Sequence, residues 1–409
     1  MHLLNKISLI CLSIALVIPS TGLAHLQPHS NSAPSDELVL GMSTALSGPT
    51  AELGRRMRAG VQLAIERYNS DRNHTHKIRL AVYDDGYEPY RVAANMNRLI
   101  DEDNSIAIIG NVGTPTAIAA LPIITEKKIL FFAPFSGAGL LRKTPPEHYV
   151  INYRASYSQE ISAMIDALIN YGGLKTDQIA FFTQRDGYGD AGYVSGFAAL
   201  KRHGLKDSRK IVHVRYERNT LAVENALADI LLSAQDIKAI VMVGAYAPCA
   251  KFIRLAKQSG LKAVFLNVSF ASSDLLLRKL GKDSSGVLVT QVVPPLTEHG
   301  APIVQQYLAD LRNITPEIGA NYVGLEGYIG ARLLLRAIDN IQGQITRERV
   351  IGALEDLGTF DLGVGVTLSL NPLQHQASHQ VWVTQLQQEK TSPYEWQQIK
   401  ALLQRETSP

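Results

Sequence analysis

The residues best suited to bind a small molecule follow an apolar run at 106–110, where the chain passes through Asn111-Val112-Gly113 into Thr114 and Pro115. Threonine followed by proline predicts a helix with Thr114 as N-cap and proline in its first turn. The free N–H groups and positive dipole end of that helix point beyond the preceding strand. The segment therefore predicts a seat for an anionic or polar small group, although capping alone would also explain Thr114.

Two other groups could suggest metal binding or covalent catalysis. His375 and His379 have helical spacing, but Asn371-Pro372 and polar neighbours predict a turn before a strand. Cys249 follows a proline at a predicted helix start, where a thiol pKa could be lowered, yet no base accompanies it. We interpret the histidines as ordinary polar residues and the cysteine as buried structure.

An acidic loop follows the predicted strand at 79–83 and contains Asp84, Asp85 and Glu88. Paired carboxylates can perform acid–base chemistry, but no nucleophile or activating partner is evident, and their spacing fits no calcium loop. We interpret the loop as hydrogen-bonding structure at the edge of a cleft. We therefore expect no enzymatic activity, no metal and no cofactor.

The same order of strand, glycine-containing turn and helix recurs along the chain. Predicted strands at 38–42, 106–110, 179–183 and 239–244 each precede a helix, with helix starts near Asp190 and Pro248 in the last two cases. This alternation predicts an α/β fold of right-handed βαβ units with parallel sheets covered on both faces. Ligands in such sheets bind beyond the carboxyl ends of the strands.

The length of 409 residues and the 46% hydrophobic content predict a large core and two domains. Residues 1–24 have the pattern of a secretory signal peptide, and residues 25–36 are predicted to be a disordered leader. Without that peptide 39 basic and 37 acidic side chains remain, so nothing indicates a nucleic-acid partner. One cysteine remains, which excludes an internal disulfide in the exported chain.

Several short motifs, in this order and spacing, resemble a known family. They are Ala45-Leu46-Ser47-Gly48-Pro49, Asp84-Asp85-Gly86-Tyr87-Glu88-Pro89, Ala133-Pro134-Phe135-Ser136-Gly137-Ala138, Tyr188-Gly189-Asp190-Ala191-Gly192 and Glu326-Gly327-Tyr328. The chain resembles the periplasmic substrate-binding proteins of the branched-chain amino acid ABC transporter type, which have the type I periplasmic, receptor-ligand-binding fold. The resemblance covers nearly all of residues 37–385.

The resemblance implies two Rossmann-like lobes, with parallel-rich sheets flanked by helices, joined by three crossing segments and closing like a clamshell. Lobe 1 would contain residues 37–154 plus 292–360, and lobe 2 residues 155–291 plus 361–409. The crossings are expected near 152–154, 290–295 and 360–365, each extended or glycine-containing. Tyr153, Arg154 and Tyr157 could serve either the hinge or the cleft.

The resemblance also implies a set of ligand-contacting positions. In lobe 1 they are Leu53, Gly113, Thr114, Ser136 and Ala138, and in lobe 2 they are Tyr188, Tyr246 and Ser269. Hydroxyl and backbone N–H groups can bind a carboxylate, and tyrosines can stack on an organic body or donate a hydrogen bond to it.

One departure from the family concerns charge. Amino-acid-binding members commonly place a carboxylate against the ligand's ammonium in lobe 2, but the matching segment reads Asn267-Val268-Ser269-Phe270. A desolvated ammonium needs a compensating charge, and Asp186 could supply it from the adjacent loop. Otherwise the ligand is expected to be a carboxylate, amide or aromatic acid without an ammonium group.

The sequence therefore predicts a periplasmic, monomeric solute-binding protein that captures a small polar organic ligand, such as an amino acid, amide or carboxylate. The expected partners are the membrane permease subunits of an ABC importer. The alternative is a ligand-sensing protein that serves a membrane receptor or kinase.

Overall fold

The computed structural model describes residues 37–407 except 75, 298, 316–318 and 389. The predicted signal peptide and leader, residues 1–36, lie outside the described residues. Among the helices of the described residues, none is both long and apolar enough to cross a bilayer.

The first lobe is built on a five-stranded sheet in which every pairing is parallel. Its order is β2 (Lys77–Asp84), β1 (Glu37–Thr44), β3 (Ala107–Ile109), β4 (Leu130–Phe132) and β5 (Val150–Ile151). The helices between these strands are α1 (Ala51–Ser70), α2 (Pro89–Asn97) and α3 (Thr114–Lys127). The buried aliphatic and aromatic residues of β3 and β4 explain why these short strands lie inside the sheet.

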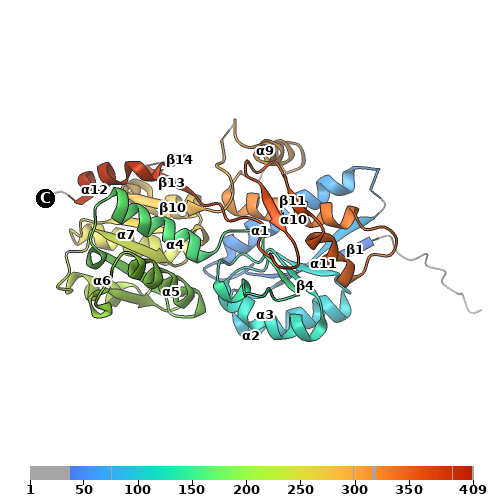
Figure 1. The fold of residues 1–409 in the computed structure, drawn as a ribbon, viewed down its shortest axis with the longest axis horizontal. Helices are drawn as coiled ribbons and strands as arrows, with labels where there is room; N and C mark the ends of the chain where they lie inside the picture. The colour runs from blue at the N-terminus through green and yellow to red at the C-terminus, as the bar shows by residue number, and fades with distance from the viewer. Residues whose placement is uncertain (1–36, 75, 298, 316–318, 389, 408–409) are drawn as a thin grey trace, which may run out of the picture. The chain divides into compact units, whose positions relative to one another are not determined.

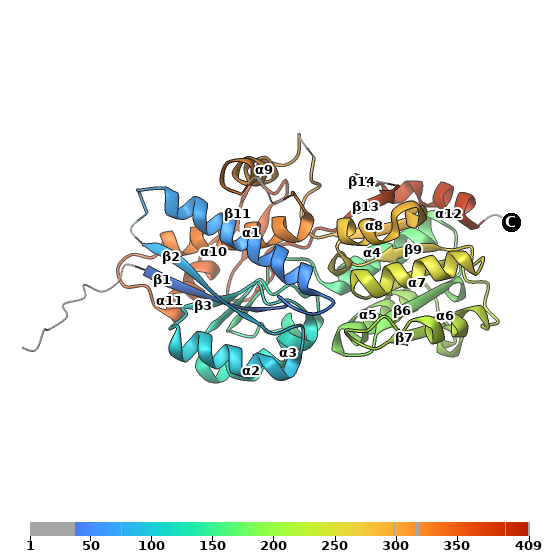
Figure 2. The ribbon, with the colours of Figure 1, turned by 180° about the vertical axis from the view of Figure 1, so that it is seen from behind.

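Three later helices complete this lobe: α9 (Pro302–Ile314), α10 (Tyr322–Asp339) and α11 (Arg347–Glu355). Figures 1 and 2 show α10 beside α1 although the two are far apart in the chain. A Cβ atom on Gly60 of α1 would lie only 1.9 Å from the carbonyl oxygen of Gly324 on α10. Glycine at this position therefore permits the two helix backbones to approach closely.

The second lobe contains a seven-stranded sheet whose pairings are parallel except for two antiparallel pairings at one edge. Its order is β14 (Lys390–Pro393), β13 (Trp382–Gln387), β10 (Val287–Gln291), β9 (Val264–Asn267), β8 (Ala239–Val243), β6 (Ile179–Gln184) and β7 (His213–Tyr216). Its helices are α4 (Tyr157–Asp166), α5 (Gly187–Arg202), α6 (Glu224–Leu231), α7 (Tyr246–Gln258), α8 (Ser273–Leu280) and α12 (Ile399–Thr407). The predicted α/β fold with two lobes of parallel-rich sheets is confirmed.

Three chain segments join the two sheets. The first leads from β5 to α4, the second from β10 to α9, and the third from β12 (Leu368–Leu370) to β13. In the third segment residues 375–378 run beside the first, because the N–H of Asn152 donates to the carbonyl of His375 (2.8 Å) and the N–H of Ser378 donates to that of Tyr153 (2.8 Å).

The segment at 358–370, which includes the expected third crossing near 360–365, forms a hairpin of β11 (Gly358–Phe360) and β12. This hairpin is tied to the first lobe, since the carbonyl of Gly363 accepts from Ile303 of α9 and the carbonyl of Asp361 from Arg336 of α10. We therefore propose that the third crossing lies within 371–381, and that residues 361–370 belong to lobe 1.

Candidate functional site

The two lobes contact one another through hydrogen bonds and ion pairs on several sides. The Tyr246 hydroxyl donates to the carbonyl of Pro49 (2.8 Å), and Gln184 donates to the Tyr87 hydroxyl (3.1 Å). Further contacts between the lobes are the ion pairs Arg218–Glu88 (2.8 Å) and Arg56–Asp274. The described structure is therefore closed, and it buries the side chains between the lobes.

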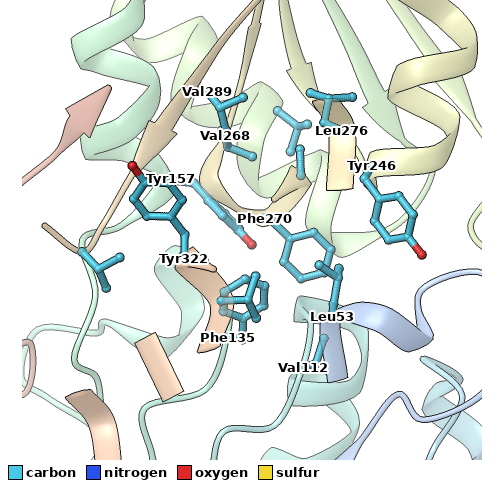
Figure 3. Close-up of a cluster of buried hydrophobic side chains, with 14 of the residues drawn as sticks. Leu53, Val112, Phe135, Tyr157, Tyr246, Val268, Phe270, Leu276, Val289 and Tyr322 are labelled. Carbon is cyan, nitrogen blue, oxygen red and sulfur yellow. The ribbon is translucent and has the colours of Figure 1, made fainter. Parts of the chain in front are cut away.

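Aromatic rings fill the centre of this interface. The ring of Phe270 lies 5.2 Å from that of Phe135, 4.7 Å from that of Tyr188 and 5.9 Å from that of Tyr87, between ring centroids. All four residues are buried. Figure 3 shows Leu53, Val112 and Phe135 of the first lobe facing Phe270 and Val268 of the second.

The predicted role of Thr114 as N-cap is wrong. Gly113 is the N-cap of α3, and Thr114 is the first helical residue. The buried Thr114 hydroxyl instead lies 2.7 Å from the hydroxyl of Ser136, in a pair where either can donate. Gly113 has φ +100°, and a Cβ there would lie 2.0 Å from the ring of Tyr87. Glycine is needed at this position for both reasons.

Ser136 belongs to the loop after β4, and Arg142 holds that loop in place. One guanidinium nitrogen of Arg142 donates to the carbonyls of Ser136 and Ala138, each at 3.1 Å. The N–H of Ala138 donates to the Ser136 hydroxyl (3.3 Å). Within the Thr114–Ser136 pair one hydroxyl donates to the other. The proton of the accepting hydroxyl is then available to another acceptor, such as a ligand.

The sequence predicted a helix start near Asp190, which would place Tyr188 on the preceding loop. The structure places Tyr188 inside the helix. α5 begins at Gly187, and the carboxylate of Asp186 caps it by accepting from the N–H of Tyr188 (3.0 Å). Asp186 also accepts from Gln184 (2.7 Å) and lies 3.5 Å from Arg218. Burial raises the pKa of Asp186, whereas these hydrogen bonds and the charge of Arg218 lower it by a smaller amount. Asp186 therefore already has a cation and a helix cap as partners.

The remaining predicted residues lie around the same interface. Leu53 of α1 is fully buried, and Tyr246 at the start of α7 is buried except for a small part. Ser269 begins a short 3-10 turn, Ser269–Ala271, directly after β9. Thus Thr114, Ser136, Tyr188 and Ser269 reach the region from four different segments.

Arg154, in the first crossing, is one of the three residues that the sequence left undecided between hinge and cleft. Its side chain is 1% exposed and lies over the ring of Phe135, 4.9 Å from the centroid. One terminal nitrogen donates to Glu160 (3.1 Å) and to the Ser269 hydroxyl. Burial lowers the pKa of Arg154, but Glu326 and Glu160 more than offset this and hold the guanidinium charged.

Glu160 of α4 is the lobe 2 carboxylate that sequence reasoning missed. It is fully buried, and its oxygens accept from the Ser269 N–H (2.8 Å), the Ser269 hydroxyl (3.1 Å) and the Thr290 hydroxyl, besides Arg154. A signal existed in the sequence, because Glu160 lies three residues after Tyr157 and four before Met164, on the apolar face of the helix. A glutamate on such a face requires a partner.

Glu326 of α10 faces the same guanidinium from the first lobe. Burial raises its pKa to about 7, with Arg154 acting in the opposite direction. Near neutral pH this carboxyl therefore exists in both charged and neutral forms, and its charge balances Arg154 only partly.

The other candidate groups have ordinary structural roles. His375 contacts Glu355 (2.9 Å) and the carbonyl of Val150 (3.0 Å), whereas His379 contacts glutamine side chains. No group of three or more metal-ligating side chains occurs within the part of the chain that the structure describes. Cys249 is buried, which raises the pKa of its thiol.

The acidic loop forms the hydrogen bonds expected of it. Asp84 accepts from the N–H groups of Leu46 (2.7 Å), Ser47 (3.1 Å) and Gly86 (2.9 Å). Glu88 binds Arg218 and Asn219 of the second lobe. Within the first lobe the loop therefore stabilises the turns at Leu46–Ser47 and at Gly86. Through Glu88 it also contacts the second lobe.

A separate cavity of about 560 Å³ lies on the first lobe, and it contains none of the predicted site residues. It is lined by α1, α9 and α10, with Tyr68 and Asp339 joined by a hydrogen bond of 2.5 Å. The buried polar and aromatic groups between the lobes fit the predicted ligand chemistry better, because hydroxyl, cationic and aromatic groups converge there.

Removing the Tyr246–Pro49 hydrogen bond should favour opening of the lobes. One hydrogen bond contributes about 0.5–1.5 kcal/mol net, so Tyr246→Phe should increase the radius of gyration of the ligand-free protein in solution scattering. Tyr328→Phe is a matched control, because it removes a bond to Asp310 (2.7 Å) inside one lobe and should leave the scattering profile unchanged. Equal profiles for all three proteins would contradict a role for Tyr246 in closure.

Residues 37–391 match a family model described as periplasmic binding protein. The chain belongs to this family. The resemblance to periplasmic binding proteins of the branched-chain amino acid transporter type is thereby confirmed, together with the fold of two lobes. Members of this family are substrate-binding proteins.

Individual periplasmic binding proteins resemble the chain over most of its length. A solved structure of a possible leucine/isoleucine/valine-binding protein from Rhodopirellula baltica SH 1 is 45% identical, covers 90% of this chain and 99% of its own, and superposes with a TM-score of 0.86. An amino acid binding protein of Pseudomonas aeruginosa is 25% identical over 67% of this chain and 72% of its own. The Leu/Ile/Val-binding protein of Escherichia coli K12 is 23% identical over 64% and 69%.

Proposed function

We propose that this protein is exported to the periplasm, captures a small polar organic ligand between its two lobes, and delivers it to the membrane permease subunits of an ABC importer. The ligand class comprises amino acids, amides and carboxylates. We propose further that the protein acts as a monomer, without enzymatic activity, after removal of residues 1–24.

One observation carries the proposal. Hydroxyl, guanidinium and aromatic side chains from both lobes converge in one buried region, and the residues that the family resemblance suggested are among them. A site divided between two lobes binds ligand most fully when the lobes are closed, which is the property a transporter can recognise. The names of the relatives support a ligand-binding role, since several are amino acid binding proteins.

A thermal-shift screen of the purified protein tests this proposal. A compound present at 100 times its dissociation constant should add about 2.7 kcal/mol to the free energy of unfolding and raise the melting temperature. The panel should contain amino acids, their amides, and carboxylic acids of similar size. If no member of the panel raises the melting temperature, capture of such ligands is contradicted, and turnover of any member would contradict a purely binding role.

A further inference from the structure

The strongest clue to the ligand is the way charges are paired at Glu160. Its two oxygens accept four hydrogen bonds, from the Ser269 N–H and hydroxyl, from Thr290 and from Arg154. A carboxylate has about four lone-pair positions, so these donors occupy the acceptor capacity of Glu160. An ammonium group on a ligand would have to displace one of them.

The charge of Arg154 makes such a displacement unfavourable. Arg154 and Glu160 form a fully buried ion pair with a nitrogen–oxygen distance of 3.1 Å. A second cation beside Glu160 would face the guanidinium of Arg154, and Arg142 adds a further positive charge near the Ser136 loop. Like charges in a desolvated region repel strongly. The built-in cation therefore disfavours a ligand ammonium here.

Arg154 also has nitrogen donors without a hydrogen-bond acceptor in the described residues, although its Nη1 forms a longer ion pair with Glu326 (3.6 Å). Among the described residues its Nε and Nη1 groups have no hydrogen-bond acceptor, and neither has the hydroxyl of Tyr157. Both side chains are at most 1% exposed, and the guanidinium lies 5.8 Å from the Tyr157 ring centroid. Burial raises the pKa of Tyr157, so its hydroxyl stays protonated and can donate. Buried donors without acceptors are costly, which indicates an acceptor that arrives with a ligand.

The surroundings of these donors are aromatic. Phe135 lies below the Arg154 guanidinium, and Phe270 contacts both Phe135 and Tyr188. Near neutral pH Glu326 is partly neutral, because burial raises its pKa to about 7, so it repels an incoming anion less than an ordinary carboxylate would. The region thus combines cationic and hydroxyl donors with apolar rings.

We propose that Arg154 and Tyr157 bind the carboxylate of the ligand, and that the ligand is an organic acid with an apolar body and no ammonium group. This inference rests on the proposed function and narrows its ligand class. The guanidinium of Arg154 would then occupy the place beside Glu160 that the ammonium group of an amino acid ligand would otherwise take.

Matched pairs of compounds test the inference in the unmodified protein. Leucine is compared with 4-methylpentanoate and 4-methyl-2-oxopentanoate, and phenylalanine with 3-phenylpropanoate, by thermal shift and isothermal titration. In at least one pair the acid without an ammonium group should bind at least about tenfold more tightly than the amino acid, a difference of about 1.4 kcal/mol. Tighter binding of the amino acid in every pair that binds would overturn the inference and leave the proposed function intact. Binding of amides alone would likewise overturn the inference and leave the proposed function intact. If no compound binds, both the inference and the proposed function are contradicted.

Two variants locate the carboxylate. Tyr157→Phe removes an unpartnered hydroxyl, so the best acid should lose about three- to tenfold in affinity while the ligand-free melting temperature is maintained. Tyr394→Phe is the matched control, because its hydroxyl is also buried and unpartnered within the described residues but belongs to the segment after β14. Arg154→Lys, which keeps the charge but changes the donor geometry, should weaken the acid at least tenfold. Unchanged affinity in both Tyr157→Phe and Arg154→Lys would overturn the assignment.

Discussion

Replacing Glu160 by alanine should destabilise the protein by about 3–5 kcal/mol, the range expected when one partner of a buried ion pair is removed. The change would leave Arg154 without its closest carboxylate and would remove the acceptor for the Ser269 N–H. Urea unfolding of the ligand-free protein, followed by circular dichroism, measures the difference. Glu160→Gln keeps the shape and part of the hydrogen bonding, so its loss should be smaller.

Glu102→Ala is the appropriate control for this change. Glu102 is also a glutamate near an arginine, 3.5 Å from Arg98, but its side chain is 72% exposed. Its removal should leave the unfolding midpoint indistinguishable from that of the parent. A loss below about 1 kcal/mol for Glu160→Ala would contradict the buried ion pair with Arg154, since removing one partner of such a pair produces the larger penalty.

Replacing Gly113 by alanine should have a comparable effect for steric reasons. The backbone at Gly113 has φ +100°, and the added Cβ would lie 2.0 Å from Cε2 of the buried Tyr87 ring. Backbone strain of about 1–3 kcal/mol and overpacking of about 1–3 kcal/mol together predict a loss of about 2–6 kcal/mol. The same urea unfolding experiment measures it.

Gly139→Ala provides the comparison for this second variant. Gly139 follows the Ser136 loop in the same lobe, and its φ is negative. Apart from its own chain neighbours, no atom of the described residues lies within 4 Å of the position that a Cβ would take. Its unfolding midpoint should equal that of the parent or exceed it slightly. If both glycine variants unfold at the same urea concentration, the ring of Tyr87 does not lie against Gly113.

The sheet strands could be predicted from the sequence because their apolar runs are continuous. Residues 179–183 and 239–244 were expected as strands, and β6 and β8 lie there, with every residue of both buried. Such runs are typical of parallel strands covered on both faces. The third crossing was less predictable. Glycines near 363 suggested a hinge, but glycine marks tight hairpin turns equally well, and Phe360 and Leu368 hold that hairpin in the core.

The candidate site was harder to predict, because it depends on contacts between distant segments. The pairing of Arg154 with Ser269 joins positions 115 residues apart, and no local pattern indicates it. The position of Thr114 near the site could be expected, but its hydrogen-bond partner could not. A threonine before proline suggests helix capping, whereas the structure pairs the hydroxyl of Thr114 with that of Ser136. Among the site residues that the sequence analysis missed, Glu160 had a usable signal, its position on an apolar helix face.

The pairing of the first and third crossings has a mechanical consequence. Residues 152–153 and 375–378 form a short hydrogen-bonded ribbon, and the Asn152 side chain also donates to the carbonyl of Leu141 (2.8 Å). A ribbon of two bonded segments resists torsion about its long axis more than a single segment does, so the lobes should rotate about one bending axis. Arg154 directly follows this ribbon. A ligand that binds the guanidinium of Arg154 therefore acts directly on the segment about which the lobes rotate.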